Sequence, residues 1–223
     1  MDSVTEVSQL QDCPTKEADI KAMQQAPYNT YRSIIAGSLM YLTGATRPDI
    51  GFAVNQLARF VANPGKPHWE YLTYLLRYLA RFPSLGIHYC GRDFQERLLE
   101  DERKRGYWSS PDNLPQPQLL SESFGNNVIS YADSDWASDV DTRRSTTGWV
   151  TFMNGGPLSW RVKRQDIMAA SSTEAELYAL SDCVKQVQWL RMFLGELGYP
   201  QPARTPGRGG KIAVSQEPWL CDF

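Results

Sequence analysis

The stretch "ISYADSDWAS", residues 129–138, places acids in a segment whose pattern otherwise predicts a β-strand. Asp133 and Asp135 lie inside it, and Asp139 follows one residue beyond its end. Because side chains alternate along a strand, Asp133 and Asp135 are expected on the same side. From this strand alone, a solvated face or a turn at the strand end explains the acids without any chemistry.

A second group of acids opens a predicted long helix, in "SSTEAELYAL". A capping box could pair Ser171 with Glu174 or Thr173 with Glu176, and either box explains one glutamate without catalysis. If the first box forms, Glu176 remains at the edge of an apolar stripe, where a partly buried carboxylate needs a partner such as a divalent cation. The strand acid and the helix acid are therefore predicted to meet above the sheet.

Three strands and a helix are predicted to position these acids. The strands are "NVISYADSDWA", "TTGWVTFMNG" and, after a turn at Gly155-Gly156-Pro157, "LSWRVKR". A helical pattern runs from Ser172 to about Leu197, with Gly198 as the residue that ends it. Its predicted apolar stripe consists of Leu177, Leu180, Cys183, Val184, Val187, Leu190 and Leu194. Hairpin-linked strands that lead into a helix predict an α/β unit over residues 128–199, with antiparallel strands and the helix packed on one face.

Upstream of the strands, residues 28–90 carry three helical patterns that predict a small helical unit. The patterns are "NTYRSIIAGSLMYLTGA", "RPDIGFAVNQLARFVANPG" and "KPHWEYLTYLLRYLARFP". Residues 1–27 are polar and are expected to form a loose, disordered arm. Residues 91–127 mix charges with Pro, Ser, Asn and Gln, which predicts a linker or insertion, and residues 200–223 predict an irregular tail.

Composition sets limits on the class of protein. The chain has 223 residues, 42% of them hydrophobic, and a formal net charge of −2, so it can fill a core but has no overall basic field. The four cysteines show no C-x-x-C spacing, which argues against a structural zinc site or a disulfide scaffold. The first two dozen residues lack an apolar signal region, and no segment reaches the roughly 18 apolar residues of a membrane span. We expect an intracellular protein, cytoplasmic or nuclear, without membrane contact.

A short group of cations stands at the end of the third strand. Arg161, Lys163 and Arg164 could hold phosphate beside the aromatic ring of Trp160. A solvated strand end explains the same residues equally well. Local cations of this kind are the candidate nucleic-acid contacts that the sequence offers.

Two long stretches carry a resemblance to a known family. They are "YADSDWASDVDTRRSTTGWVTFMNGGPLSWRVKRQDIMAASSTEAELYALSDCVKQVQWLRMFLGELGY" and "YRSIIAGSLMYLTGATRPDIGFAVNQLARFVANPGKPHWEYLTYLLRYLARFPSLGIHY". The first resembles the ribonuclease H domain of copia-type retrotransposon polyproteins, and the second is similar to the segment that closes their reverse transcriptase. The resemblance covers about residues 128–199 and 28–90. It implies a ribonuclease H-like fold and hydrolysis of the RNA strand of RNA–DNA hybrids.

The resemblance also implies a site with four carboxylates and two Mg²⁺ ions, one that readies the attacking water and one that steadies the leaving oxygen. The first carboxylate falls on Asp133 and the second on Glu176, which are the predicted catalytic and metal-binding residues. Asp135 and Glu174 are assigned to support or capping. The third and fourth carboxylates are not recognisable after Tyr199, and Asp222 in "PWLCD" is the remaining candidate for the third.

The resulting hypothesis is a truncated retrotransposon polyprotein fragment whose Mg²⁺-dependent ribonuclease H is impaired by the loss of two carboxylates. The alternative is a non-catalytic remnant that at most binds nucleic acid or another partner. No Y-x-D-D string occurs, so template copying by this chain is not expected. The sequence leaves the oligomeric state open.

Overall fold

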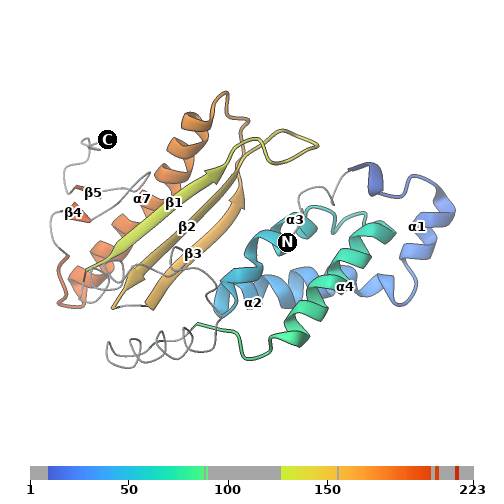
Figure 1. The fold of residues 1–223 in the computed structure, drawn as a ribbon, viewed down its shortest axis with the longest axis horizontal. Helices are drawn as coiled ribbons and strands as arrows, with labels where there is room; N and C mark the ends of the chain where they lie inside the picture. Colours follow the sequence, from blue (N-terminus) through green and yellow to red (C-terminus); the bar gives the residue numbers. More distant parts are fainter. Residues whose placement is uncertain are drawn as a thin grey trace, which may run out of the picture. The chain divides into compact units, whose positions relative to one another are not determined.

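The computed structural model describes residues 10–87, 89, 127–154 and 156–201, together with the backbone of residues 204–205 and 214–215 (Figure 1). Several predictions fall on residues outside this part of the chain. They concern residues 91–126 of the predicted linker and the candidate acid Asp222.

Two compact units make up the described chain. Unit 1 holds the described residues up to Gly86, with 134–148 and 161–178, and unit 2 holds the described residues of 87–133, 149–160 and 179 onward. The boundary runs through the three sheet strands and the long helix, so each of these elements contributes to both units. The predicted division into residues 28–90 and 128–199 follows the order of the chain instead, and it stays a prediction.

The helices of unit 1 confirm the three helical patterns, with one difference in type. They comprise the π-helix Ser33–Leu39, α2 (Met40–Ala45), α3 (Gly51–Ala58) and α4 (Lys66–Arg81), with 3-10 turns at Tyr28–Thr30 and Pro48–Ile50. The first pattern is therefore divided among three segments instead of forming one α-helix. A π-turn is wider than an α-turn, so residues four apart stay on one side, and Tyr31, Ile35 and Leu39 all reach the core.

A continuous hydrophobic core joins these segments. Its buried members are Tyr31, Ile35, Leu39, Ile50, Val54, Leu57, Leu72 and Leu75. The hydroxyl of Tyr31 donates a hydrogen bond to the carbonyl oxygen of Leu57 at 2.9 Å, so the one polar atom of that buried ring has a partner. Helix α4 begins where the backbone N–H of Gly65 donates to Nδ1 of the buried His68 at 2.9 Å. A side chain on Gly65 would collide with the carbonyl oxygen of Asp12, so this close approach requires glycine.

Residues 10–23, which the sequence assigns to a disordered arm, contain a 3-10 turn at Leu10–Asp12 and helix α1 (Glu17–Met23). Met23 is buried, and the side chain of Asn63 donates a hydrogen bond to the carbonyl oxygen of Pro14. A few such contacts order a segment whose polar composition alone predicts none. The arm prediction is therefore corrected for residues 10–23.

The sheet contains β1 (Ile129–Asp135), β2 (Thr146–Met153) and β3 (Gly156–Arg164) in the spatial order β1-β2-β3, and it is antiparallel. Helix α7 (Ser172–Glu196) follows the third strand. In unit 2, Val128 directly before β1 and Trp149 of β2 share a core cluster with Cys183, Val187 and Leu194 of α7. The sequence-based prediction of an α/β unit with three antiparallel strands and a long helix on one face is thus confirmed.

The buried stripe of α7 differs from the predicted one at its start. Its buried residues are Ala175, Ala179, Cys183, Val187, Leu190 and Leu194, whereas Leu177 is exposed. Two residues along an α-helix correspond to a rotation of about 200°, so Leu177 lies nearly opposite Ala175. The small alanines face inward, and the leucine between them faces outward.

Helix α7 ends as predicted, at Gly198. This residue has φ of 86°, the left-handed conformation that glycine adopts without strain. The N–H of Gly198 donates to the carbonyl of Gly195 and the N–H of Tyr199 to that of Leu194, which is the Schellman pattern. Beyond it, β4 (Arg204–Thr205) and β5 (Val214–Ser215) form a short antiparallel pair within the predicted irregular tail. The described residues include no helix with the length and apolar character needed to cross a membrane.

The core of unit 1 generates a stability prediction. Leu72→Ala should lower the free energy of unfolding by about 2–5 kcal/mol, because it leaves a cavity among fully buried side chains. Leu76→Ala, the same change four residues later on an exposed part of α4, should cost less than about 1 kcal/mol. Urea unfolding followed by circular dichroism measures both, and equal losses for the two variants would contradict the described core.

Candidate functional site

Strand β1 begins buried and ends exposed. Ile129 and Ser130 are buried, and the Ser130 hydroxyl lies 2.8 Å from that of Thr151 on β2. Asp133 and Asp135, near the other end of the strand, are exposed. The strand offers these acids to a ligand or to water.

The helix acids divide their roles as the first capping alternative predicts. The Ser171 hydroxyl accepts the N–H of Glu174 at 3.1 Å, and the Glu174 carboxylate accepts the N–H of Ala170 at 2.7 Å. Glu174 therefore caps the start of α7. Glu176 is exposed, so the expectation of a partly buried carboxylate at this position was wrong. Its candidate role now rests on the family resemblance and not on a cost of burial.

Asp133 belongs to unit 2 and Glu176 belongs to unit 1, so the position of each side chain is given only within its own unit. The predicted meeting of their carboxylates above the sheet stays a prediction.

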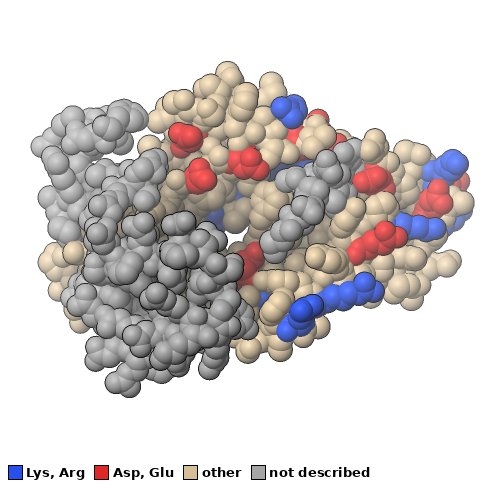
Figure 2. All heavy atoms as spheres, viewed as in Figure 1, with Lys and Arg blue, Asp and Glu red and all other residues tan. Residues whose placement is uncertain are grey.

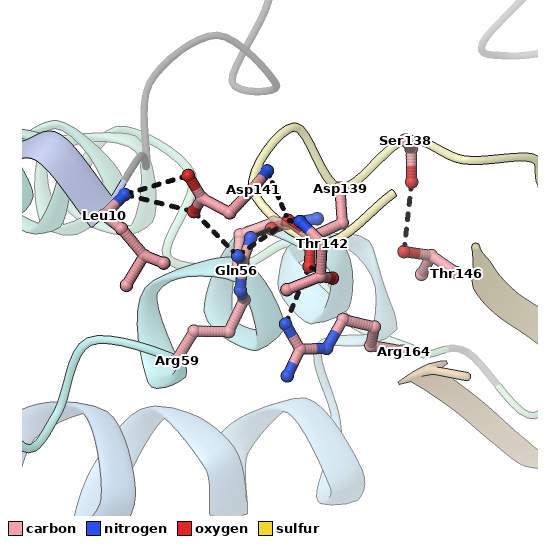
Figure 3. A network of polar contacts seen from close by, with 9 residues as sticks. All are labelled: Leu10, Gln56, Arg59, Ser138, Asp139, Asp141, Thr142, Thr146 and Arg164. Atoms are coloured by element: carbon pink, nitrogen blue, oxygen red, sulfur yellow. Dashed lines mark hydrogen bonds and ion pairs between the residues drawn. The ribbon is translucent and has the colours of Figure 1, made fainter. Parts of the chain in front are cut away.

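The third acid of the opening stretch, Asp139, has a structural role. It is only 1% exposed and lies in the loop between β1 and β2 (Figure 3). Its carboxylate accepts a hydrogen bond of 2.6 Å from the Thr142 hydroxyl and the backbone N–H of Asp141 at 3.1 Å. These contacts close the loop into a turn, which the positive φ of Arg143 continues. Asp139 shapes the connection between the strands.

Two arginines neutralise this buried carboxylate within unit 1. Nη2 of Arg59 lies 2.7 Å from one carboxylate oxygen of Asp139, and Nη1 of Arg164 lies 2.7 Å from the other. Arg59 also pairs with Asp141 at 3.0 Å, and the Asp141 carboxylate in turn accepts the backbone N–H of Leu10. The network in Figure 3 thus links α3, the β1–β2 loop, the end of β3 and the first described turn of the chain.

The pKa of Asp139 reflects this balance. Burial would raise it, but the Thr142 hydrogen bond, the Arg164 ion pair and the charge of Arg59 together lower the pKa below its usual value. A lowered pKa in the folded state means that the ionised group stabilises the fold above about pH 4, and that this stabilisation is lost as the pH falls through the folded-state pKa.

The three predicted phosphate contacts differ in how they are held. Arg164 is committed to Asp139, and Lys163 pairs with the exposed Asp166 at 2.7 Å. Arg161 is exposed on β3. In the face drawn in Figure 2, acidic and basic side chains are both spread over the described atoms. An exposed ion pair such as Lys163–Asp166 is weak enough to be exchanged for a phosphate contact, whereas the buried pair of Arg164 is not.

The carboxylates of Asp133 and Glu176 are oxygen donors of the type that Mg²⁺ prefers. Within the described ranges, no three His, Cys, Asp or Glu side chains are grouped so that they could hold a metal ion. Two carboxylates suit one hydrated cation but are too few for the pair of ions that the resemblance implies. The described residues therefore fit the two-ion site incompletely.

Sequence reasoning missed the role of Arg59. This residue stands in a helical pattern 80 positions before Asp139, and no spacing rule connects the two. The only signal in the sequence was a cation in a mostly apolar helical pattern, directly before Phe60. In the structure, the Arg59 guanidinium lies over the Phe60 ring, 5.1 Å from its centroid. Contacts between distant segments of this kind follow from the tertiary fold.

Comparison with known proteins gives a consistent set of relatives. The Retrovirus-related Pol polyprotein from transposon TNT 1-94 of Nicotiana tabacum is 35% identical over 189 residues, which cover 85% of this chain and 12% of the polyprotein. The corresponding polyprotein from transposon RE1 of Arabidopsis thaliana is 35% identical over 168 residues, covering 75% of this chain and 9% of its own length. The Secreted RxLR effector protein 161 of Plasmopara viticola is 33% identical over 168 residues, which cover 94% of that protein.

No family model and no solved structure matches the chain. The fold is that of an α/β protein with a three-stranded antiparallel sheet and one long helix. The chain belongs to the family of copia-type, retrovirus-related Pol polyproteins. It spans only 12% and 9% of the two polyproteins named above, and 94% of the shorter relative.

The Asp139 network generates a pH-dependent prediction. Asp139→Asn should lower the free energy of unfolding by about 3 kcal/mol at pH 7, because it leaves two guanidinium groups beside a neutral side chain. The difference should shrink as the pH is lowered below about 4 and disappear below the lowered folded-state pKa, where the native carboxyl group is also protonated. Denaturant unfolding at a series of pH values measures the difference.

Asp166→Asn is the matched control, because it removes the partner of Lys163 in an exposed, solvent-screened ion pair and should change stability little at any pH. A loss for Asp139→Asn that is absent at pH 7, or that is constant down to pH 2, would contradict the assigned role of the carboxylate.

Proposed function

We propose that this chain is a ribonuclease H-type segment of a retrotransposon polyprotein that binds RNA–DNA hybrids but does not cleave them by itself. The resemblance of residues 128–199 to the ribonuclease H domain of this family supports the choice of substrate class, and the structural partners of the carboxylates support the absence of cleavage. The single observation that carries the proposal is that other acids of α7 and of the β1–β2 loop already have structural partners.

Three acids of the described chain show this allocation to structural partners. Asp139 is held by Arg59 and Arg164, and the Glu174 carboxylate accepts the N–H of Ala170. On α7, the Asp182 carboxylate accepts the indole N–H of Trp149 at 2.9 Å. Metal coordination by any of the three would cost stability. It would leave the arginines beside Asp139, the Ala170 N–H beside Glu174 or the Trp149 indole N–H beside Asp182 without a partner.

Asp133 and Glu176 are then the two acids that the family pattern assigns to the metal site. Two-ion hydrolysis of a phosphodiester requires one ion at the attacking water and a second at the leaving oxygen. A pair of carboxylates can hold one hydrated Mg²⁺ and position it near a phosphate. We therefore propose Mg²⁺-assisted binding of the hybrid without turnover.

Arg161 and Lys163 are the proposed phosphate contacts on β3. Arg161 is exposed, and Lys163 can exchange the exposed carboxylate of Asp166 for a phosphate oxygen. Arg164 is excluded from this role, because its withdrawal would leave the buried Asp139 short of a counter-charge. This contact set gives a sequence-independent affinity that falls with salt.

Cleavage and binding of a hybrid with a labelled RNA strand test the proposal. In the presence of Mg²⁺, the purified chain should give no more RNA cleavage than its Asp133→Asn variant. Fluorescence anisotropy should show binding that weakens with salt, and Arg161→Gln should weaken it several-fold because one phosphate contact is lost. Arg77→Gln, an exposed arginine on α4 that is not part of the proposed contact set, is the matched control.

Two results would overturn the proposal. Cleavage that is abolished by Asp133→Asn and by Glu176→Gln, yet kept by Asp135→Asn, would establish a complete nuclease. Absence of any salt-dependent binding to the hybrid would remove the nucleic-acid partner.

A further inference from the structure

The outer face of α7 carries large apolar side chains that neither the core nor the candidate site uses. Trp189 is 55% exposed, Met192 70% and Phe193 44%. The rings of Trp189 and Phe193 are stacked, with centroids 5.4 Å apart and planes at 4° to each other. Exposed aromatic groups of this size on one helix face are typical of a contact surface.

Charged residues flank this apolar group on the same face. With 3.6 residues per turn, Lys185, Trp189, Met192 and Glu196 fall on one line along the helix, opposite the buried Val187 and Leu194. Lys185 and Glu196 are both exposed. We call Lys185, Trp189, Met192, Phe193 and Glu196 the outer stripe. All five belong to unit 2.

The order of residues in the outer stripe lets it pair with a second copy of itself that runs in the opposite direction. It reads basic, aromatic, methionine, acidic from the N-terminal to the C-terminal end. If a second α7 runs antiparallel across it, Trp189 lies opposite the partner's Met192, and Lys185 lies opposite the partner's Glu196. A parallel arrangement would instead place each charge opposite its own copy. The pattern therefore selects one occupant and one direction.

We propose that the outer stripe is the contact surface for a second copy of this chain, through an antiparallel pair of α7 helices related by a two-fold axis. A two-fold contact uses the same patch twice, so each sequence feature acts in duplicate. Each dimer gains two tryptophan–methionine contacts, in which the polarisable sulfur lies against an aromatic ring, and two ion pairs at the ends. This proposal is independent of the proposed function, because no residue of the outer stripe belongs to the candidate site.

Charge reversal tests both the partner and the direction. Sedimentation velocity over a range of protein concentrations should show a monomer–dimer equilibrium for the chain. Lys185→Glu and Glu196→Lys should each weaken dimerisation about tenfold, because each places two like-charge pairs at the contact. The double variant, which exchanges the two charges, should restore the original affinity. Trp189→Ala should weaken it by more than tenfold, as expected for a central aromatic contact.

Lys66→Glu and Glu70→Lys on α4 make the same charge changes at exposed positions away from the outer stripe, and they should leave dimerisation unchanged. Circular dichroism of every variant verifies that α7 is still folded. A chain that stays monomeric at all concentrations, or a dimer that the exchange variant fails to restore, would overturn the proposal. The same holds if Trp189→Ala weakens binding of an RNA–DNA hybrid by a monomeric chain, because the occupant would then be nucleic acid.

Discussion

A buried carboxylate between two arginines is the interaction on which the described part of unit 1 depends. Asp139 lies almost out of contact with water, where an unpaired charge would cost several kcal/mol. Arg59 directly follows α3 and Arg164 ends β3, so the neutralisation of one carboxylate requires both segments to be in place. The loop between β1 and β2 and the turn at Leu10 are held by the same group of charges.

The contacts of Asp139 also distinguish acids with a structural role from acids that are exposed and available to a ligand. "ADSDWASD" looks like a row of equivalent carboxylates, but exposure divides them, since Asp133 and Asp135 face outward and Asp139 is enclosed. The same division occurs among the cations of β3, where Arg164 supports the fold and Arg161 is exposed. A residue that neutralises a buried charge can bind a substrate only by leaving that charge unpaired, which lowers the stability of the fold. Candidate contacts with nucleic acid are therefore restricted to the exposed members of each group.

Local rules predicted much of the fold from the sequence. The three strands, the span of α7, its stop at Gly198 and the Ser171–Glu174 cap follow from alternation, helical period and capping chemistry, which act between close neighbours. The order of residues 10–23 and the pairing of Arg59 with Asp139 were not predictable in this way. Both rest on contacts between segments far apart in the chain, and composition carries no record of them.

The candidate site was predicted from family resemblance more than from physics. Capping chemistry correctly removed Glu174 from the list of acids, but the period of α7 misplaced Leu177 and, with it, the supposed burial of Glu176. A helix that packs alanines toward a sheet exposes leucines that a hydrophobicity pattern would place inside. Farther along α7, Trp189, Met192 and Phe193 are exposed on the outer stripe, which we propose a second α7 covers.

The most direct test of the central claim is a double-mutant cycle between Arg59→Met and Asp139→Asn, read from the free energy of unfolding at pH 7. Each single variant removes one of two ion-pair partners from the other residue, since Asp139 keeps Arg164 and Arg59 keeps Asp141, while the double variant removes both charges. We predict a coupling free energy of about 2 kcal/mol or more between the two positions. A coupling within about 0.5 kcal/mol of zero, as found for independent sites, would contradict the account.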